Sequence, residues 1–159
     1  ALVREPRFCG QTAFTWSVAA HSLLLLDYVR QERSDMAESH DVCLGILLHD
    51  APEFVLKDVA SPFKAILGEL YKELQRRTQE VIHAGFGVNL SPEEDDLIRI
   101  CDKEILLAEA AVLLPSKGLD WEFAQKYKPA SLAGVKMKIA EYSESAIDRA
   151  YKYELERYI

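Results

Sequence analysis

Apolar residues recur at helical spacing along most of the chain, and this periodicity restricts the possible folds more than any other feature. One such run begins after Ser17, a residue type that often caps helix N-termini. A second run, over residues 41–50, is apolar on nearly all sides, so we expect a central buried helix there. No segment shows convincing period-two alternation bounded by turn residues. The sequence therefore predicts an all-α fold.

Further start and stop signals divide the rest of the chain into helices. Ser-Pro pairs at 61–62 and 91–92 predict two N-termini, because serine caps a helix and proline suits its first turn. A long amphipathic helix is expected over about 135–159, with an apolar stripe that includes Ile139, Tyr142, Ile147 and Tyr151. The chain shows no repeat and no linker, so residues 1–159 are predicted to form a single domain.

The charge balance and the cysteine count limit the partners and the compartment. The 159 residues carry a net charge of −7, which argues against binding a nucleic-acid polymer or an anionic membrane. The apolar runs are far shorter than the roughly 20 residues that span a bilayer. Three widely spaced cysteines without a CxxC pair favour a cytoplasmic protein. Tyrosines near the end (Tyr151, Tyr153 and Tyr158) predict a homo-oligomer, a dimer or higher.

Four ionisable residues stand among apolar neighbours: His21, the adjacent pair His49 and Asp50, and Asp102. A buried acid is costly unless it is paired or bound to a metal. Two imidazoles and two carboxylates form a mixed ligand set suited to Mn, Fe, Co, Ni or Zn. Adjacent residues on a helix diverge by about 100°, so His49 and Asp50 can converge on one ion only from a helix end. Spacing alone leaves two interpretations open. These residues either bind a metal or are core residues whose polar atoms are paired within the protein.

The same residues resemble a known signature. His21, His49-Asp50 and Asp102 resemble the H…HD…D pattern of the HD-domain metal-dependent phosphohydrolases. The likeness to a bacterial and phage subgroup extends over residues 7–113 and includes R-F-C-G at 7–10, W-S-V-A-A-H at 16–21, L-L-H-D-A-P-E at 47–53, D-V-A-S-P-F-K at 58–64 and C-D…E at 101–109. The chain departs from the usual pattern at Ala20, Lys57 and Ala60, which leaves the substrate's identity open.

This resemblance implies a single HD-type helical bundle with enzymatic activity. Its motif-bearing core would cover about 7–113, followed by the C-terminal helix at about 135–159. The leading expectation is hydrolysis of the 5′-phosphate of deoxyribonucleoside monophosphates by attack of a metal-bound water. One alternative is removal of triphosphate from a dNTP such as dATP, and another is an HD phosphodiesterase on a different small nucleotide. A non-catalytic helical binding module is a third.

The resemblance also implies roles for individual residues. His21, His49, Asp50 and Asp102 would hold one divalent transition metal ion (Mn, Co, Zn, Fe or Ni), and Glu109 would not be a ligand. Glu53 and Asp58 would be catalytic carboxylates, although each could equally be an ordinary surface or loop acid.

The substrate contacts would come from basic and aromatic residues. Arg7 and Lys64 are candidate phosphate clamps. Phe8 and Trp16 are candidate contacts to the base or sugar, with core packing as the alternative for both.

Overall fold

The computed structural model describes residues 1–141 and 143–159, apart from the side chain of Ser61, and it confirms the all-α prediction. The described part contains no strand, only an isolated antiparallel bridge between Pro6 and Ser17. The α-helices are α1 (Val18–Glu32), α2 (His40–Leu48), α3 (Glu53–Leu56), α4 (Ser61–Phe86), α5 (Pro92–Leu113), α6 (Leu132–Glu141) and α7 (Glu144–Arg157). Short 3₁₀ helices lie at Leu2–Arg4, Phe8–Gly10, Met36–Glu38 and Glu122–Gln125.

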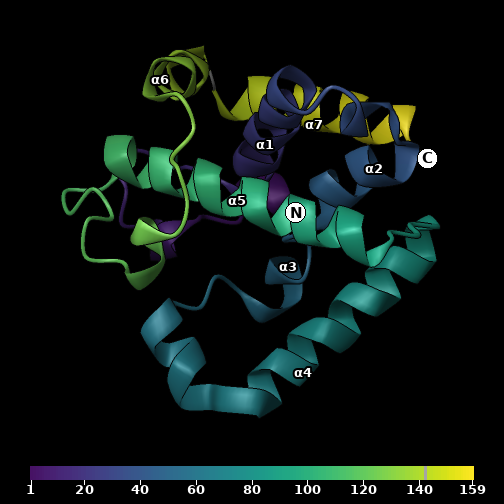
Figure 1. Ribbon diagram of the computed structural model, residues 1–159, viewed down its shortest axis with the longest axis horizontal. Coiled ribbons are helices and arrows are strands. Elements are labelled where there is room, and N and C mark those ends of the chain that lie inside the picture. Colours follow the sequence, from purple (N-terminus) through teal and green to yellow (C-terminus); the bar gives the residue numbers. More distant parts are fainter. Residues whose placement is uncertain (142) are drawn as a thin grey trace.

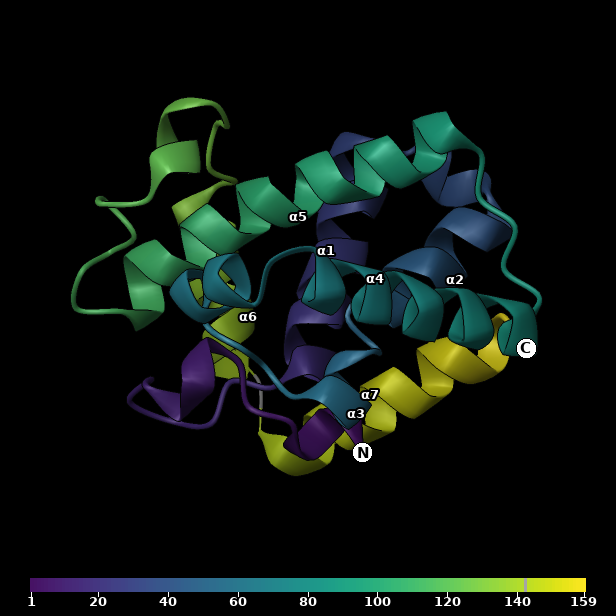
Figure 2. The ribbon, with the colours of Figure 1, turned by 90° about the horizontal axis from the view of Figure 1, so that it is seen from below.

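Helix α1 lies at the centre of the bundle and packs against α2, α5 and α7 (Figure 1). Its middle is buried on every side, from Leu23 to Leu26, because the surrounding helices cover all of its faces. Viewed from below, α4 runs alongside the bundle, with α5 and α7 on either side in projection (Figure 2). None of the described helices is both long and apolar enough to cross a bilayer.

Serine caps fix the starts of the helices that carry the predicted ligands. The Ser17 hydroxyl accepts a hydrogen bond from the Ala20 backbone N–H, as the sequence predicts. Ser91 and Glu94 form a reciprocal capping box at the start of α5. The Ser39 hydroxyl accepts a hydrogen bond from the Val42 N–H at the start of α2, and this helix ends at Leu48, just before the His-Asp pair. At the predicted Ser61 cap, the N-cap position of α4 is Ala60, and the Ser61 side chain lies outside the described part.

The predicted single helix over 135–159 is wrong, because two helices, α6 and α7, occupy this region. The Ser143 side chain accepts a hydrogen bond from the Ala146 N–H, so a separate helix, α7, begins at Glu144. Apolar periodicity alone did not reveal this interruption. Tyr142, part of the predicted stripe, lies outside the described residues.

The C-terminal tyrosines do not form one exposed patch. Tyr151 is buried, and its hydroxyl donates a hydrogen bond to the Leu47 carbonyl. Tyr158 packs against the core, and only Tyr153 of the three is exposed. The tyrosine cluster therefore gives no support to an oligomer interface at this end of the chain.

Candidate metal centre

His21 lies in the middle of α1 and is completely buried. Its Nδ1 is 2.9 and 3.0 Å from the two carboxylate oxygens of Glu109, a buried residue near the end of α5. A carboxylate accepts from Nδ1–H, which leaves Nε2 as the metal-binding nitrogen of a neutral ring. This Nε2 lies 3.1 Å from Asp102 Oδ1 and 3.2 Å from His49 Nε2.

His49 and Asp50 follow the last residue of α2, as the helix-end argument requires. The His49 Nδ1 lies 2.7 Å from the Ile46 carbonyl, so its Nε2 faces the same point as that of His21. Asp50 Oδ2 is 3.3 Å from His49 Nε2 and 4.0 Å from His21 Nε2. The four predicted ligands are thus brought together from α1, the end of α2 and the middle of α5.

The donor set fits a divalent cation. Ligand atoms about 2.0–2.2 Å from one ion lie roughly 3–4 Å from each other. The contacts among the His21, His49 and Asp50 atoms fall in this range, and all three lie within 4.8 Å of one another. Asp102 Oδ1 flanks them, 3.9 Å from His49 Nε2. The mutually close group is therefore two histidine nitrogens and one carboxylate oxygen, with the Asp102 carboxylate beside it, a mixed N/O set that suits the transition metals that the sequence predicts.

The surrounding charges keep the carboxylates ionised. Burial raises the pKa of Asp50, but His49 and Arg7 outweigh it and hold this pKa well below its usual range. Burial likewise opposes ionisation of Asp102, whose pKa is nevertheless lowered by the hydrogen bond to His21. Burial lowers the pKa of His21, but Glu109 and Asp102 raise it to about 9. Without a metal, His21 is thus the cation at the centre of the cluster near neutral pH.

Glu53 lies beside this centre, and Asp58 lies near Glu53. Glu53 begins α3 and is buried, with Oε1 3.9 Å from Lys64 Nζ and Oε2 without a hydrogen-bond partner among the described residues. Burial and the charge of Asp50 raise its pKa to about 7. Asp58 accepts a hydrogen bond of 2.9 Å from the Cys9 N–H and so ties the 3₁₀ helix Phe8–Gly10 to the site.

The predicted substrate contacts have different environments. Arg7 is buried and pairs with Asp50 and, at 3.9 Å, with Glu109. Phe8 is partly exposed and stacks near Trp121.

Trp16 does not face a substrate. It is completely buried, and its indole N–H donates to Glu109, so the core-packing alternative is the correct one for this residue.

Three polar residues of α4 were not identified from the sequence. Tyr71 is buried, its hydroxyl has no hydrogen-bond partner in the described part, and burial together with Glu53 and Asp58 raises its pKa. It lies seven residues after Lys64, but Gly68 breaks α4 between the two residues, so no helical spacing in the sequence pointed to Tyr71.

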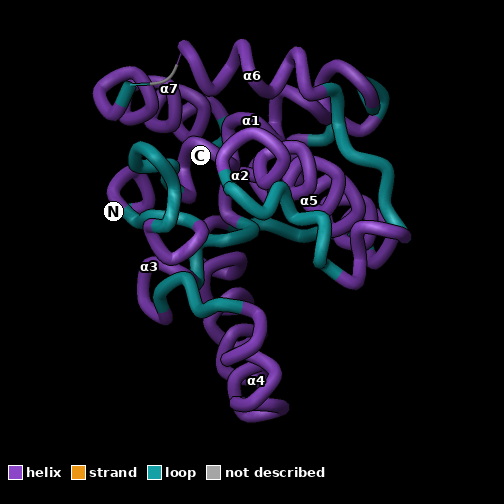
Figure 3. Tube along the Cα trace, turned by 90° about the vertical axis from the view of Figure 1, so that its left-hand side faces the viewer, coloured by secondary structure: helices purple, strands orange, loops and turns teal. Residues whose placement is uncertain are grey.

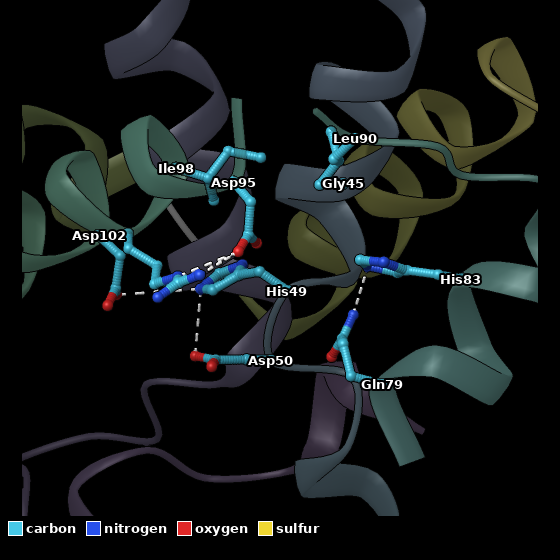
Figure 4. A pocket seen from close by; sticks show the side chains of 10 residues that line it. Gly45, His49, Asp50, Gln79, His83, Leu90, Asp95, Ile98 and Asp102 are labelled. Carbon is cyan, nitrogen blue, oxygen red and sulfur yellow. Dashed lines mark hydrogen bonds and ion pairs between the residues drawn. The ribbon is translucent and has the colours of Figure 1, made fainter. Parts of the chain in front are cut away.

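Gln79 and His83 line a cavity of about 230 Å³ that also borders His49, Asp50 and Asp102 (Figure 4). Asp95 and Arg99 of α5 line its opposite side. The cavity therefore opens directly onto the candidate ligands, between α4 and α5.

Comparison with known proteins gives relatives but no function. No family model matches the chain. It is 40% identical over 84 residues to an uncharacterized protein of Rhodobacter capsulatus, covering 52% of this chain and 42% of that protein. It is 30% identical over 115 residues to YfdR of Escherichia coli K12, also described as uncharacterized, covering 72% of this chain and 58% of YfdR. The chain thus spans about half the length of the curated relatives it matches.

Proposed function

We propose that the chain is a metal-dependent phosphohydrolase that removes the 5′-phosphate of deoxyribonucleoside monophosphates. The observation that carries this proposal is the convergence of His21 Nε2, His49 Nε2, Asp50 Oδ2 and Asp102 Oδ1 beside a buried acid, Glu53. A purely structural ion would not need a further acid with an unpartnered oxygen. The resemblance of the same residues to the HD-domain signature supports the assignment.

A divalent ion bound by these four residues would lower the pKa of a water molecule and withdraw charge from the phosphoryl oxygens. The protein itself orients the ligands and determines which atoms carry protons. Glu109 keeps His21 in the tautomer that presents Nε2. Arg7 pairs with Asp50 Oδ2, the same oxygen that faces the two histidines, and so offsets its negative charge.

The groups around Glu53 suit a phosphate ester. Glu53 Oε2 can accept a proton from the attacking water, while Lys64 and the Tyr71 hydroxyl supply a charge and a donor for the phosphoryl oxygens. In the reaction, the water oxygen bonds to phosphorus, the P–O5′ bond breaks and O5′ takes a proton. The products are orthophosphate and a deoxynucleoside.

The charge and the cavity favour a small nucleotide over a polymer. The chain carries −7 overall, so anionic substrates depend on the few local cations at the site. A cavity of about 230 Å³ at the metal ligands accommodates a compact ligand rather than a strand.

The test is a product analysis with metal-stripped protein reloaded with Mn²⁺, Co²⁺ or Zn²⁺. We expect orthophosphate from dNMPs and none from dNTPs, and loss of this activity in Glu53→Gln but not in the exposed control Glu69→Gln. Tripolyphosphate from a dNTP would assign the triphosphohydrolase alternative. No metal-dependent product from any nucleotide, cyclic ones included, would refute the proposal and favour a binding module.

A further inference from the structure

Helix α4 stands apart from the rest of the bundle. It runs beneath the other helices and its far end extends away from them (Figure 3). Its main helix-to-helix packing is with α2. The backbone at Gly68 has φ 61° and divides α4 into two helical segments, 61–67 and 69–86. A helix held by so few neighbours lacks the burial that normally stabilises helices in proteins.

The two segments expose large apolar side chains on the outside of the molecule. Tyr71 points inward and is buried, whereas Leu70 beside it is 82% exposed. Phe63, Ile66 and Leu67 are exposed on the first segment. On the second segment the exposed residues recur at intervals of four and seven, the spacing of a helical stripe. We call this set the α4 stripe: Phe63, Ile66, Leu67, Leu70, Leu74 and Val81.

The α4 stripe is too large to be ordinary surface. The exposed fractions of its six residues correspond to roughly 700–800 Å² of residue surface, backbone included, which is comparable to the share that each partner gives to a standard protein–protein interface. Isolated apolar residues on a surface need no explanation, but contiguous patches above a few hundred Å² mark interaction sites. Two copies of the α4 stripe would together bury the area that a stable dimer needs.

The charges beside the α4 stripe favour a second copy of this chain as the occupant. Residues 69–80 alternate acids and bases, with Glu69, Glu73 and Glu80 against Lys72, Arg76 and Arg77, so this segment has no net charge. A neutral segment of mixed sign can meet its own copy without like-charge repulsion, although each chain carries −7. An anionic membrane would require a basic surface, which this helix does not present.

We propose that the chain forms a homodimer in which the α4 stripes of two copies pack against each other. Other residues of α4 face the body of the molecule. Lys64 and Tyr71 lie near Glu53. Gln79 and His83 line the cavity. Dimer formation therefore covers the outer side of α4 and holds its inner side over the candidate metal centre. The inference does not depend on the proposed function, since an oligomeric mass is measured without any substrate.

The test is the mass in solution of the purified chain and two variants, by light scattering and sedimentation over a range of concentrations. The wild type is expected at twice the 18.0 kDa of one chain. Ile66→Glu combined with Leu70→Glu is expected to be a monomer, with a dimer dissociation constant raised at least about 100-fold because charges would be buried unpaired. Both side chains are at least 80% exposed, so the fold does not depend on them.

The matched control is Leu119→Glu, which changes an equally exposed leucine (82%) in the loop after α5 and is expected to leave the dimer intact. A monomeric wild type at tens of micromolar would overturn the proposal. So would a double variant that remains dimeric with wild-type affinity, because the dimer would then use another surface. Circular dichroism of the double variant distinguishes loss of dimer from loss of fold.

Discussion

Replacing Glu109 by glutamine tests how the candidate metal centre is built, because this residue contacts Nδ1 of the proposed ligand His21, on the ring side opposite the nitrogen that would bind the ion. Its carboxylate accepts from His21 Nδ1 and from the Trp16 indole N–H, both at 2.9 Å, and lies 3.9 Å from Arg7 Nε. Glutamine keeps the shape and one accepting oxygen. Its amide N–H₂ group, however, replaces the second oxygen and faces groups that are themselves donors.

The structure sets the size of this effect. A charge-assisted hydrogen bond becomes a neutral one, and the buried amide N–H₂ that replaces the second oxygen faces donors and lacks an acceptor, which together cost about 1–3 kcal/mol. Because His21 is then less well oriented, we expect metal affinity to fall about 10- to 100-fold. An opposing effect arises near pH 7, since removing the charge of Glu109 also lowers the raised pKa of His21 and weakens proton competition.

The assay is therefore a competition titration with a chromophoric chelator at about pH 9.5, above the His21 pKa of about 9 in the wild type. The matched control is Glu104→Gln, which alters another acid of α5 that accepts a hydrogen bond, from the Tyr28 hydroxyl at 2.8 Å. This control is expected to bind metal like the wild type. Equal affinities for Glu109→Gln and the wild type at this pH would refute the role of Glu109.

Three further predictions concern other parts of the chain. Asp50→Asn is expected to abolish turnover and weaken metal binding while the far-UV circular dichroism stays helical; wild-type turnover would contradict the assignment of Asp50 as a ligand. In metal-stripped protein the pKa of His21 is raised to about 9, so metal must displace its proton below that pH. Affinity measured by calorimetry should rise about tenfold per pH unit from 7 to 9, with proton release, and a flat profile would be inconsistent with a neutral His21 ligand. Ser143→Ala removes the cap that starts α7 and should lower the free energy of unfolding by about 1 kcal/mol in urea titrations. An unchanged midpoint would show that this cap contributes nothing.

Local signals predicted much of the fold and which residues form the candidate metal centre. Ser17 and Ser91 mark helix starts by chemistry that acts within one turn, so they are readable from sequence. The adjacency of His49 and Asp50 required a helix end, and α2 ends there. The interruption between α6 and α7 was missed because the apolar pattern continues past Ser143, the residue that caps α7.

Contacts between distant residues were harder to predict. Glu109 meets His21 across 88 residues of sequence, and nothing local indicates which acid will face which histidine. From the sequence alone, Trp16 could contact the base of a nucleotide or pack in the core. Its complete burial in the structure distinguishes the two. The apolar residues of α4 have the periodicity of a buried face, yet periodicity does not specify whether the covering surface belongs to the same chain.

The most direct measurement of the central claim is a stoichiometric titration of metal-stripped protein with Mn²⁺ or Co²⁺, recording orthophosphate release from a dNMP at each step. We predict no activity without metal, a linear rise and a single break at one ion per chain, because His21, His49 and Asp50 lie within 4.8 Å of one another and Asp102 contacts His21 beside them. Full activity in the stripped protein, or no orthophosphate release at any metal concentration, would contradict the account.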